Sequence, residues 1–258
     1  MKAKDGVKSL GARGYLVAAV LLCASCSSPL WGGVVLDLTA AGSSGSIGGA
    51  YFEQVDPQAT GSGVIDPFVR LSTNQDVSEG YNTDARPLQF DENNSPQFTR
   101  SLLLESVPTV DYGGSPYKEF LLDINQNGTT QGRYLSLDAM QLYLAGSGDL
   151  TGYPALGTPI YDLDAGSDNW IWLNARLNHG SGTGDMLAYV PEGLVSEAAG
   201  PYVYIYSRFG EHYANNAGFE EWAVRTGQAP PEIPAPGAIV LTCIGVCVVG
   251  WLRRMQIA

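Results

Sequence analysis

The central part of this chain contains no cysteine. The four cysteines of the 258-residue sequence all lie near its two ends, at Cys23, Cys26, Cys243 and Cys247. Disulfides, thiol catalysis and cysteine-based metal sites are therefore excluded for the body between the ends, residues 29–236. Since an exported domain is free to use disulfides, the body must be stabilised by a hydrophobic core, which a segment of about 200 residues can form.

Basic residues are scarce as well. The sequence has 14 Lys and Arg against 26 Asp and Glu, for a net charge of −12. Six of the basic residues but only one acid, Asp5, belong to the ends, which leaves 8 basic against 25 acidic residues in the body. Lys118 is the body's one lysine. Such a surface repels nucleic acid and anionic membranes, so nucleic-acid binding is excluded.

Motifs that carry catalysis are missing too. His179 and His212 are the two histidines, and the chain has no Gly-x-Ser-x-Gly elbow, His-Glu-x-x-His pair or phosphate-binding loop. We therefore expect no enzymatic activity. Paired carboxylates for glycoside hydrolysis stay open, because so many acids guarantee some close pairs. His212 follows Glu211 and is expected in a solvent-facing loop.

One long apolar run is present, at the C-terminus. It extends from Ala238 to Trp251, and no charge falls between Glu232 and Arg253. The 17 positions from Pro236 to Leu252 approach the ~20 residues that cross a bilayer. The pattern predicts a membrane-anchor helix with a basic tail over residues 237–258, preceded by a Pro-rich linker over residues 228–236. Arginines after the helix favour a cytoplasmic end.

Pro234-Ala235-Pro236, the short apolar run and Arg253-Arg254 together resemble the PEP-CTERM sorting signal of Gram-negative bacteria. The resemblance implies an exosortase as the processing partner, insertion of the helix into the membrane, and delivery to the cell envelope, surface or extracellular matrix. The middle residue of the family's motif is usually Glu, so Ala235 marks a variant form.

The N-terminus agrees with export. Lys2, Lys4 and Lys8 precede an apolar stretch from Tyr15 to Cys23, and small residues follow. This order predicts a signal peptide over residues 1–28. The same segment resembles a lipoprotein box, with Cys26 as the residue that would carry the lipid. Ordinary cleavage is the alternative.

The body has the pattern of strands rather than helices. Short apolar or alternating runs are separated by Gly, Asn, Asp and Ser, which predicts an all-β, jelly-roll-like antiparallel sandwich over residues 61–227. The runs are Gly63–Leu71, Phe98–Leu104, Phe120–Ile124, Tyr134–Leu144, Trp170–Leu177 and Tyr202–Tyr206. Residues 29–60 are expected to hold a flexible lead-in and a first strand, with a loop over Ala40–Ala50. Alternation places Ala139 on the same side as Leu135 and Leu137.

Four stretches of the body resemble a recurring domain of exported PEP-CTERM proteins. They are Gly80–Asp84, Phe120–Asn125, Tyr134–Asp138 and Gly218–Trp222. The resemblance implies the class and the location of the protein and transfers no activity.

Two acidic segments are candidates for calcium. Asp123, Asn125 and Asn127 match the first half of a calcium loop, but Tyr134 occupies the twelfth position, where a bidentate Glu is needed. An Asn-Gly hairpin turn explains the same residues, and we favour it.

The second acidic segment contains Asp162, Asp164 and Asp168. Alternate strand residues share a face, so the first two would offer paired oxygens to Ca²⁺. A strand end followed by a Gly-Ser turn is the alternative that we favour. No other cofactor is expected.

Aromatic residues alternate along two of the predicted strands, at Trp170, Trp172, Tyr202, Tyr204 and Tyr206. Cross-strand packing is the favoured explanation. The alternative is a platform on which Trp170, Trp172 and Tyr204 stack sugar rings.

The sequence thus predicts an exported, envelope-anchored, non-catalytic surface or extracellular-matrix protein. The alternative is a carbohydrate-binding module or a glycan-active enzyme that acts on exopolysaccharide. Exposed aromatic residues would favour this alternative, and buried ones would argue against it.

Overall fold

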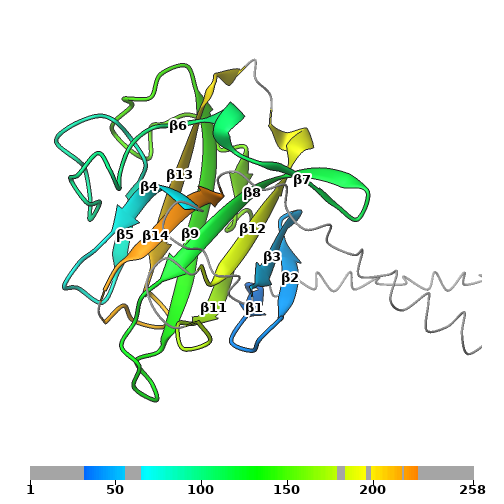
Figure 1. Ribbon diagram of the computed structural model, residues 1–258, viewed down its shortest axis with the longest axis vertical. Helices are drawn as coiled ribbons and strands as arrows, with labels where there is room; N and C mark the ends of the chain where they lie inside the picture. Colours follow the sequence, from blue (N-terminus) through cyan, green and yellow to red (C-terminus); the bar gives the residue numbers. More distant parts are fainter. Residues whose placement is uncertain (1–31, 56–64, 179–183, 196–198, 217, 226–258) are drawn as a thin grey trace, which may run out of the picture. The chain divides into compact units, whose positions relative to one another are not determined.

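A computed structural model of the chain describes residues 32–55, 65–178, 184–195, 199–216 and 218–225, and all statements below concern these residues. They form two seven-stranded sheets, shown in Figure 1, and two single 3₁₀ turns. Within this part of the chain no helix is long and apolar enough to span a bilayer. The all-β class predicted from the sequence is confirmed.

Sheet A runs in the order β1-β11-β9-β13-β5, with β10 beside β9 and β6 beside β13. Its strands are β1 (Val35–Asp37), β5 (Ser78–Tyr81), β6 (Leu102–Leu103), β9 (Tyr134–Ala145), β10 (Tyr161–Asp162), β11 (Trp170–Asn174) and β13 (Tyr202–Phe209). All pairs are antiparallel except β1 with β11.

Sheet B runs in the order β2-β3-β12-β8-β14-β4, with β7 beside β8, and is wholly antiparallel. Its strands are β2 (Ser44–Ile47), β3 (Ala50–Gln54), β4 (Ile65–Leu71), β7 (Thr109–Tyr112), β8 (Ser115–Ile124), β12 (Met186–Pro191) and β14 (Glu220–Arg225). The 3₁₀ turns are η1 (Leu104–Ser106) and η2 (Glu192–Leu194).

The main core lies between the sheets. Phe52, Phe120 and Leu122 of sheet B pack in one cluster with Leu137 and Ile205 of sheet A, and all five are almost fully buried. Because strand residues alternate between faces, the other residues of each strand form the outer faces of the two sheets. Those outer faces carry aromatic clusters of their own.

A buried hydrogen bond joins the two layers through β14 and β13. Trp222 of β14 is fully buried, and its indole Nε1 donates to Ser207 Oγ of β13 at 3.1 Å. Both groups would be unpaired without the other, so the bond specifies how β14 faces β13.

The alternation predicted for β9 is interrupted by a β-bulge. Arg208 pairs with Ala139 and Phe209 with Leu137, which leaves Asp138 as the extra residue. Leu135 and Leu137 face the main core as expected, but Ala139 belongs to the outer cluster. The predicted placement of Ala139 is therefore wrong, because the bulge shifts the alternation by one residue.

Residues 44–50 of the predicted flexible loop 40–50 belong to a hairpin. Ser44–Ile47 and Ala50–Gln54 pair across Gly48 and Gly49, whose φ values are +58° and +87°. Two consecutive positive φ values are what a tight type I′ turn needs, and glycine supplies them without strain. The described part of residues 29–60, from 32 to 55, thus contains three strands where one was predicted.

The hairpin predicted at Asn127-Gly128 is also wrong. The strand before it, β8, belongs to sheet B, and the strand after it, β9, belongs to sheet A. The two strands do not pair, so residues 125–133 connect the two layers instead of reversing the chain within one sheet.

The other predicted strands are found with different ends. Phe98–Leu104 shortens to the two residues of β6, and Phe120–Ile124 is the second half of a ten-residue strand. Pro67 lies within β4, which is the edge strand of sheet B and pairs with β14. The register of this pairing shifts between Trp222 and Ala223, and Ala223 is the partner of Pro67. A proline, which has no N–H, is tolerated at such a position.

We expect Trp222→Phe to lower the free energy of unfolding by about 2–4 kcal/mol, because it leaves the Ser207 hydroxyl unpaired and a small cavity in the core. Urea unfolding of the full chain measures this change. Leu103→Ala, at a residue with 37% of its surface exposed, is the control and should cost less than about 1 kcal/mol. Equal losses in the two variants would contradict the role assigned to the Trp222–Ser207 bond.

Candidate functional site

Four connections that cross between the sheets meet at one end of the sandwich. They join β4 to β5, β8 to β9, β11 to β12 and β13 to β14. In Figure 1 the β8–β9 and β13–β14 connections lie at the lower end of the molecule. Loops at the end of a sandwich are common places for binding sites. Two adjoining hollows lie among these connections.

The first, here called the aromatic hollow, has a volume of about 600 Å³. It is lined by Asp76, Gln131, Gly132, Tyr134, Trp172, His212, Tyr213, Ala214, Asn215 and Asn216. The rings of Tyr134 and Trp172 are 5.2 Å apart between centroids. The ring of Tyr213 stacks on Trp172 at 4.6 Å, with 20° between the planes. All three rings are half-buried.

The bulge residue Asp138 fixes the position of His212, which lines the aromatic hollow. Its side chain is 1% exposed, and its Oδ1 lies 2.7 Å from Nδ1 of His212, while its Oδ2 accepts from Ser136 Oγ and the Glu211 amide. The His212 ring stacks on Trp170 at 4.6 Å. His212 therefore lies in a loop, as predicted, but its ring is held between a carboxylate and an indole.

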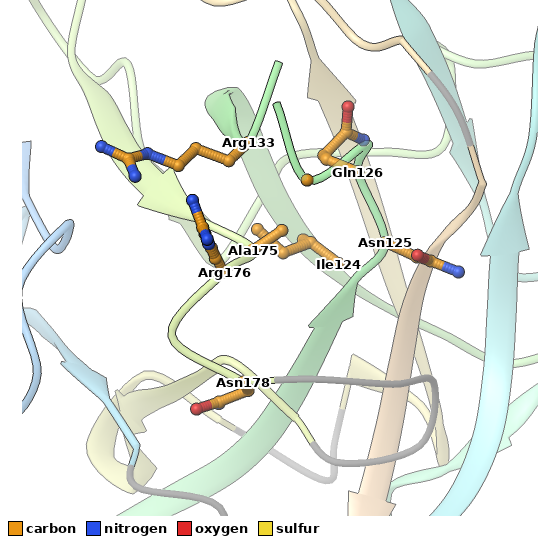
Figure 2. Close-up of a pocket in the computed structure, with 8 residues that line it drawn as sticks. Ile124, Asn125, Gln126, Arg133, Ala175, Arg176 and Asn178 are labelled. Atoms are coloured by element: carbon orange, nitrogen blue, oxygen red, sulfur yellow. The ribbon is translucent and has the colours of Figure 1, made fainter. Parts of the chain in front are cut away.

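The second hollow, here called the arginine pocket, is shown in Figure 2. Its volume is about 340 Å³, within the range of small-molecule sites. It is lined by Ile124, Asn125, Gln126, Gly128, Arg133, Ala175, Arg176 and Asn178. Figure 2 shows the Arg176 side chain pointing toward that of Arg133, with Asn125 and Gln126 on the other side of the pocket.

Arg133 links the two hollows. Its guanidinium carbon lies 4.7 Å from the centre of the Tyr134 ring, and its Nη2 donates to the Tyr134 hydroxyl at 2.7 Å. Tyr134 itself lines the aromatic hollow. A ligand that spans both hollows would thus pass directly from the arginines to the aromatic rings.

A buried carboxyl group, Glu220, lies behind both hollows. Its Oε1 accepts from Gln126 Nε2 at 2.7 Å, and its Oε2 accepts from Ser78 Oγ at 3.1 Å and Asn215 Nδ2 at 3.3 Å. Gln126 lines the arginine pocket and Asn215 the aromatic hollow. Burial raises the pKa of Glu220 to about 8, although the bonds from Ser78 and Gln126 favour the ionised form.

The first predicted calcium segment is used for other contacts. Asp123 is buried in β8 beside Glu221 of β14, and Asn125 lines the arginine pocket. Asn127 Oδ1 accepts from the amide and the hydroxyl of Thr129, which closes a local turn. In the described part of the chain no group of three or more His, Cys, Asp or Glu side chains is arranged to hold a metal. Calcium binding stays a prediction.

The second acidic segment forms a strand end and a turn, the alternative favoured from the sequence. Asp162 ends β10, and its oxygens accept from the Asp164 amide and Gln141 Nε2. Asp164 Oδ1 accepts from the Asn169 amide, and burial raises the pKa of Asp164 to about 6. Asp168 is exposed.

The predicted stacking residues separate into two groups. Trp170 and Trp172 are half-buried on the outer face of sheet A, and Trp172 lines the aromatic hollow. Tyr204 is fully buried in the outer cluster, and its hydroxyl donates to the Ser147 carbonyl. Core packing therefore accounts for Tyr204, whose ring has no exposed surface on which a sugar could stack.

The remaining predicted sites lie outside the described residues. These are Cys26, the sorting motif Pro234, Ala235 and Pro236, and the basic pair Arg253 and Arg254.

Sequence reasoning missed most of the lining residues. Tyr213, Asn215 and Asn216 sit in a connection without any pattern, and Arg133 and Arg176 are single charges next to strand ends. No sequence signal marks these two arginines, since Arg70, Arg100, Arg208 and Arg225 also have no adjacent acidic residue in the sequence and yet form ion pairs.

When the chain is compared with protein families, with curated proteins and with solved structures, it matches none of them.

The buried Glu220 predicts a pH dependence of stability. Its pKa is about 8 in the folded protein and near 4.5 in an unfolded chain. Between these values the folded state holds the extra proton, so the free energy of unfolding falls as pH rises from about 4.5 through 8. Glu220→Gln imitates the protonated side chain and should flatten this fall.

Urea unfolding of the full chain and of Glu220→Gln at pH 5, 6.5 and 8 checks the difference. The wild-type curve should fall more steeply with pH, by up to about 1.4 kcal/mol per pH unit near the middle of the window. Parallel curves for the two proteins would show that Glu220 does not bind the extra proton.

Proposed function

We propose that this chain is an exported, non-catalytic surface protein whose β-sandwich binds glycans through the aromatic hollow. The observation that carries the proposal is the grouping of Tyr134, Trp172 and Tyr213 in a hollow whose rim also offers the exposed side-chain amide of Gln131. Aromatic faces pack against the apolar faces of sugar rings, and side-chain amides are both donors and acceptors for sugar hydroxyls.

The position of these rings supports binding over simple packing. They lie on the outer face of sheet A, where Trp172 is half-buried. Four tyrosines of the outer cluster on that sheet are instead almost fully buried: Tyr81, Tyr143, Tyr204 and Tyr206. The backbone amides of His212 and Tyr213 donate to Ser136 Oγ, and these bonds hold the loop against β9. A wall that is ordered before a ligand arrives loses less entropy on binding.

Binding is also favoured over glycoside hydrolysis. Hydrolysis of a glycosidic bond uses two carboxyl groups on either side of the scissile bond. Among the described residues that line the aromatic hollow, Asp76 supplies the one carboxylate. The lining of the aromatic hollow therefore gives no support to hydrolysis by a pair of carboxyl groups, the possibility left open by the sequence.

The delivery of the protein is part of the same proposal and rests on the sequence. A signal peptide over residues 1–28 directs export, and the tail over residues 237–258 holds the protein at the envelope until an exosortase-type enzyme processes it. The proposal also includes a jelly-roll-like topology for the β-sandwich. Together these features support an adhesive role at the cell surface or in the extracellular matrix, toward polysaccharide.

Glycan-array binding by the purified full chain tests the binding function. Trp172→Ala should lower the affinity for the bound glycans about tenfold or more, since a central aromatic anchor is lost. Tyr117→Ala, a half-buried aromatic residue on the outer face of sheet B, is the matched control and should bind normally. A glycan bound equally well by both variants would contradict the aromatic hollow as the site.

Cell fractionation tests the proposed location at the cell envelope. In a Gram-negative host that has an exosortase, we expect the full chain in the envelope fraction or on the cell surface. A chain that ends at Gln228 lacks the predicted anchor and should appear in the soluble exported fractions. The same distribution for both chains would contradict an anchoring role of the tail.

A further inference from the structure

The eight basic residues of the acidic body fall into three groups. Five of them form ion pairs: Arg70 with Glu221, Arg100 with Asp66, Lys118 with Glu192, Arg208 with Glu211, and Arg225 with Glu119. Arg86 donates instead to four backbone carbonyl groups, those of Thr83, Ala85, Asn94 and Thr99. In the described part of the chain, Arg133 and Arg176 alone have neither arrangement.

These two arginines line the same pocket. Arg133 donates to a neutral phenol hydroxyl, and its Nε has no acceptor in the described part of the chain. Arg176 is exposed and forms no ion pair with any residue that the structure describes. Their side chains lie on one side of the pocket in Figure 2, with that of Arg176 directed toward that of Arg133.

The rest of the lining is unusual for this body. Acids outnumber basic residues 25 to 8 between the ends, yet the eight lining residues include two arginines and no Asp or Glu. Two neighbouring guanidinium groups repel each other unless an anion lies between or beside them. A guanidinium presents its donors in a planar fork that fits the oxygens of a carboxylate or a sulfate.

From this arrangement we infer that the arginine pocket binds an anionic substituent, a carboxylate or a sulfate group, of an acidic glycan whose neighbouring sugar ring packs in the aromatic hollow. The inference rests on the proposed glycan-binding function and names its ligand class. Arg133 makes the two parts continuous, since its guanidinium covers the Tyr134 ring, which in turn lies 5.2 Å from Trp172. The other side of the pocket is uncharged, since Asn125 and Gln126 line it.

The negative charge of the rest of the body should restrict the binding of an acidic glycan to the arginine pocket. An acidic polymer is repelled by a body with a large excess of carboxylates, so it gains attraction only where arginines without partners meet it. The interaction should therefore weaken as salt is added, because Arg176 is exposed and its charge is screened.

The test is a glycan array that contains uronate-bearing, sulfated and neutral glycans of similar length, probed with the full chain. Bound glycans should carry a carboxylate or a sulfate, and comparison of these two groups tells which anion is preferred. Arg176→Ala and Arg133→Ala should each lower the affinity for acidic glycans about tenfold. Carboxyl reduction of a bound uronate glycan should cause a similar loss.

Arg100→Ala is the control, because it removes the same positive charge from the protein. Arg100 forms its ion pair with Asp66 at the surface, and neither residue lines the arginine pocket. It should bind as the wild-type chain does. Because Arg176 is exposed, Arg176→Ala should keep the wild-type melting temperature, which separates lost binding from lost folding.

Three results have distinct meanings. Binding of neutral glycans alone, or acidic binding that is unchanged in both arginine variants, overturns the inference and leaves the proposed glycan binding intact. Failure of every glycan to bind overturns the proposed function, and this inference with it. Acidic binding that depends on Arg176 and is spared in Arg100→Ala supports both.

Discussion

A carboxyl group that is removed from water must have hydrogen-bond partners, and the shape of this sandwich's end depends on how Glu220 obtains them. Its partners come from three segments: Ser78 from sheet A, Gln126 from the β8–β9 connection and Asn215 from the β13–β14 connection. Leaving any of them unpaired in the interior would be costly. The same contacts that satisfy Glu220 therefore determine where the walls of both hollows stand.

The neighbouring bonds extend this arrangement. The Asn216 amide donates to Gln126 Oε1, its side chain donates to the Gly132 carbonyl, and the Asn215 amide donates to the Asp76 carbonyl. Three connections that are far apart in the sequence are thereby tied into one polar layer beneath the hollows. A partly buried network of this kind favours one arrangement of the loops, since each member satisfies another. This is the physical basis for treating the end of the sandwich as a preformed surface.

Several features could be predicted from the sequence because they depend on local patterns. Alternation identified β9, β11 and β13, and the excess of turn residues indicated an all-β fold. Other predictions from the sequence were wrong because one or two residues override the local pattern. The bulge at Asp138 moves Ala139 to the outer face, and Gly48-Gly49 turns a glycine-rich stretch into a hairpin. Asn127-Gly128 has the composition of a hairpin turn, but its flanking strands find better partners in different sheets.

The sequence by itself determined the class of the fold, the excess of acidic side chains and the segments that suggest export, because composition and short-range periodicity carry that information. Only the tertiary structure decided that Tyr204 is closed in while Trp172 lines a hollow, although both residues alternate along aromatic strands. It also decided that Arg133 and Arg176, more than forty positions apart, share a pocket without an acid. Alternation tells which strand residues share a face, but which loops or strands cover that face depends on contacts between distant segments.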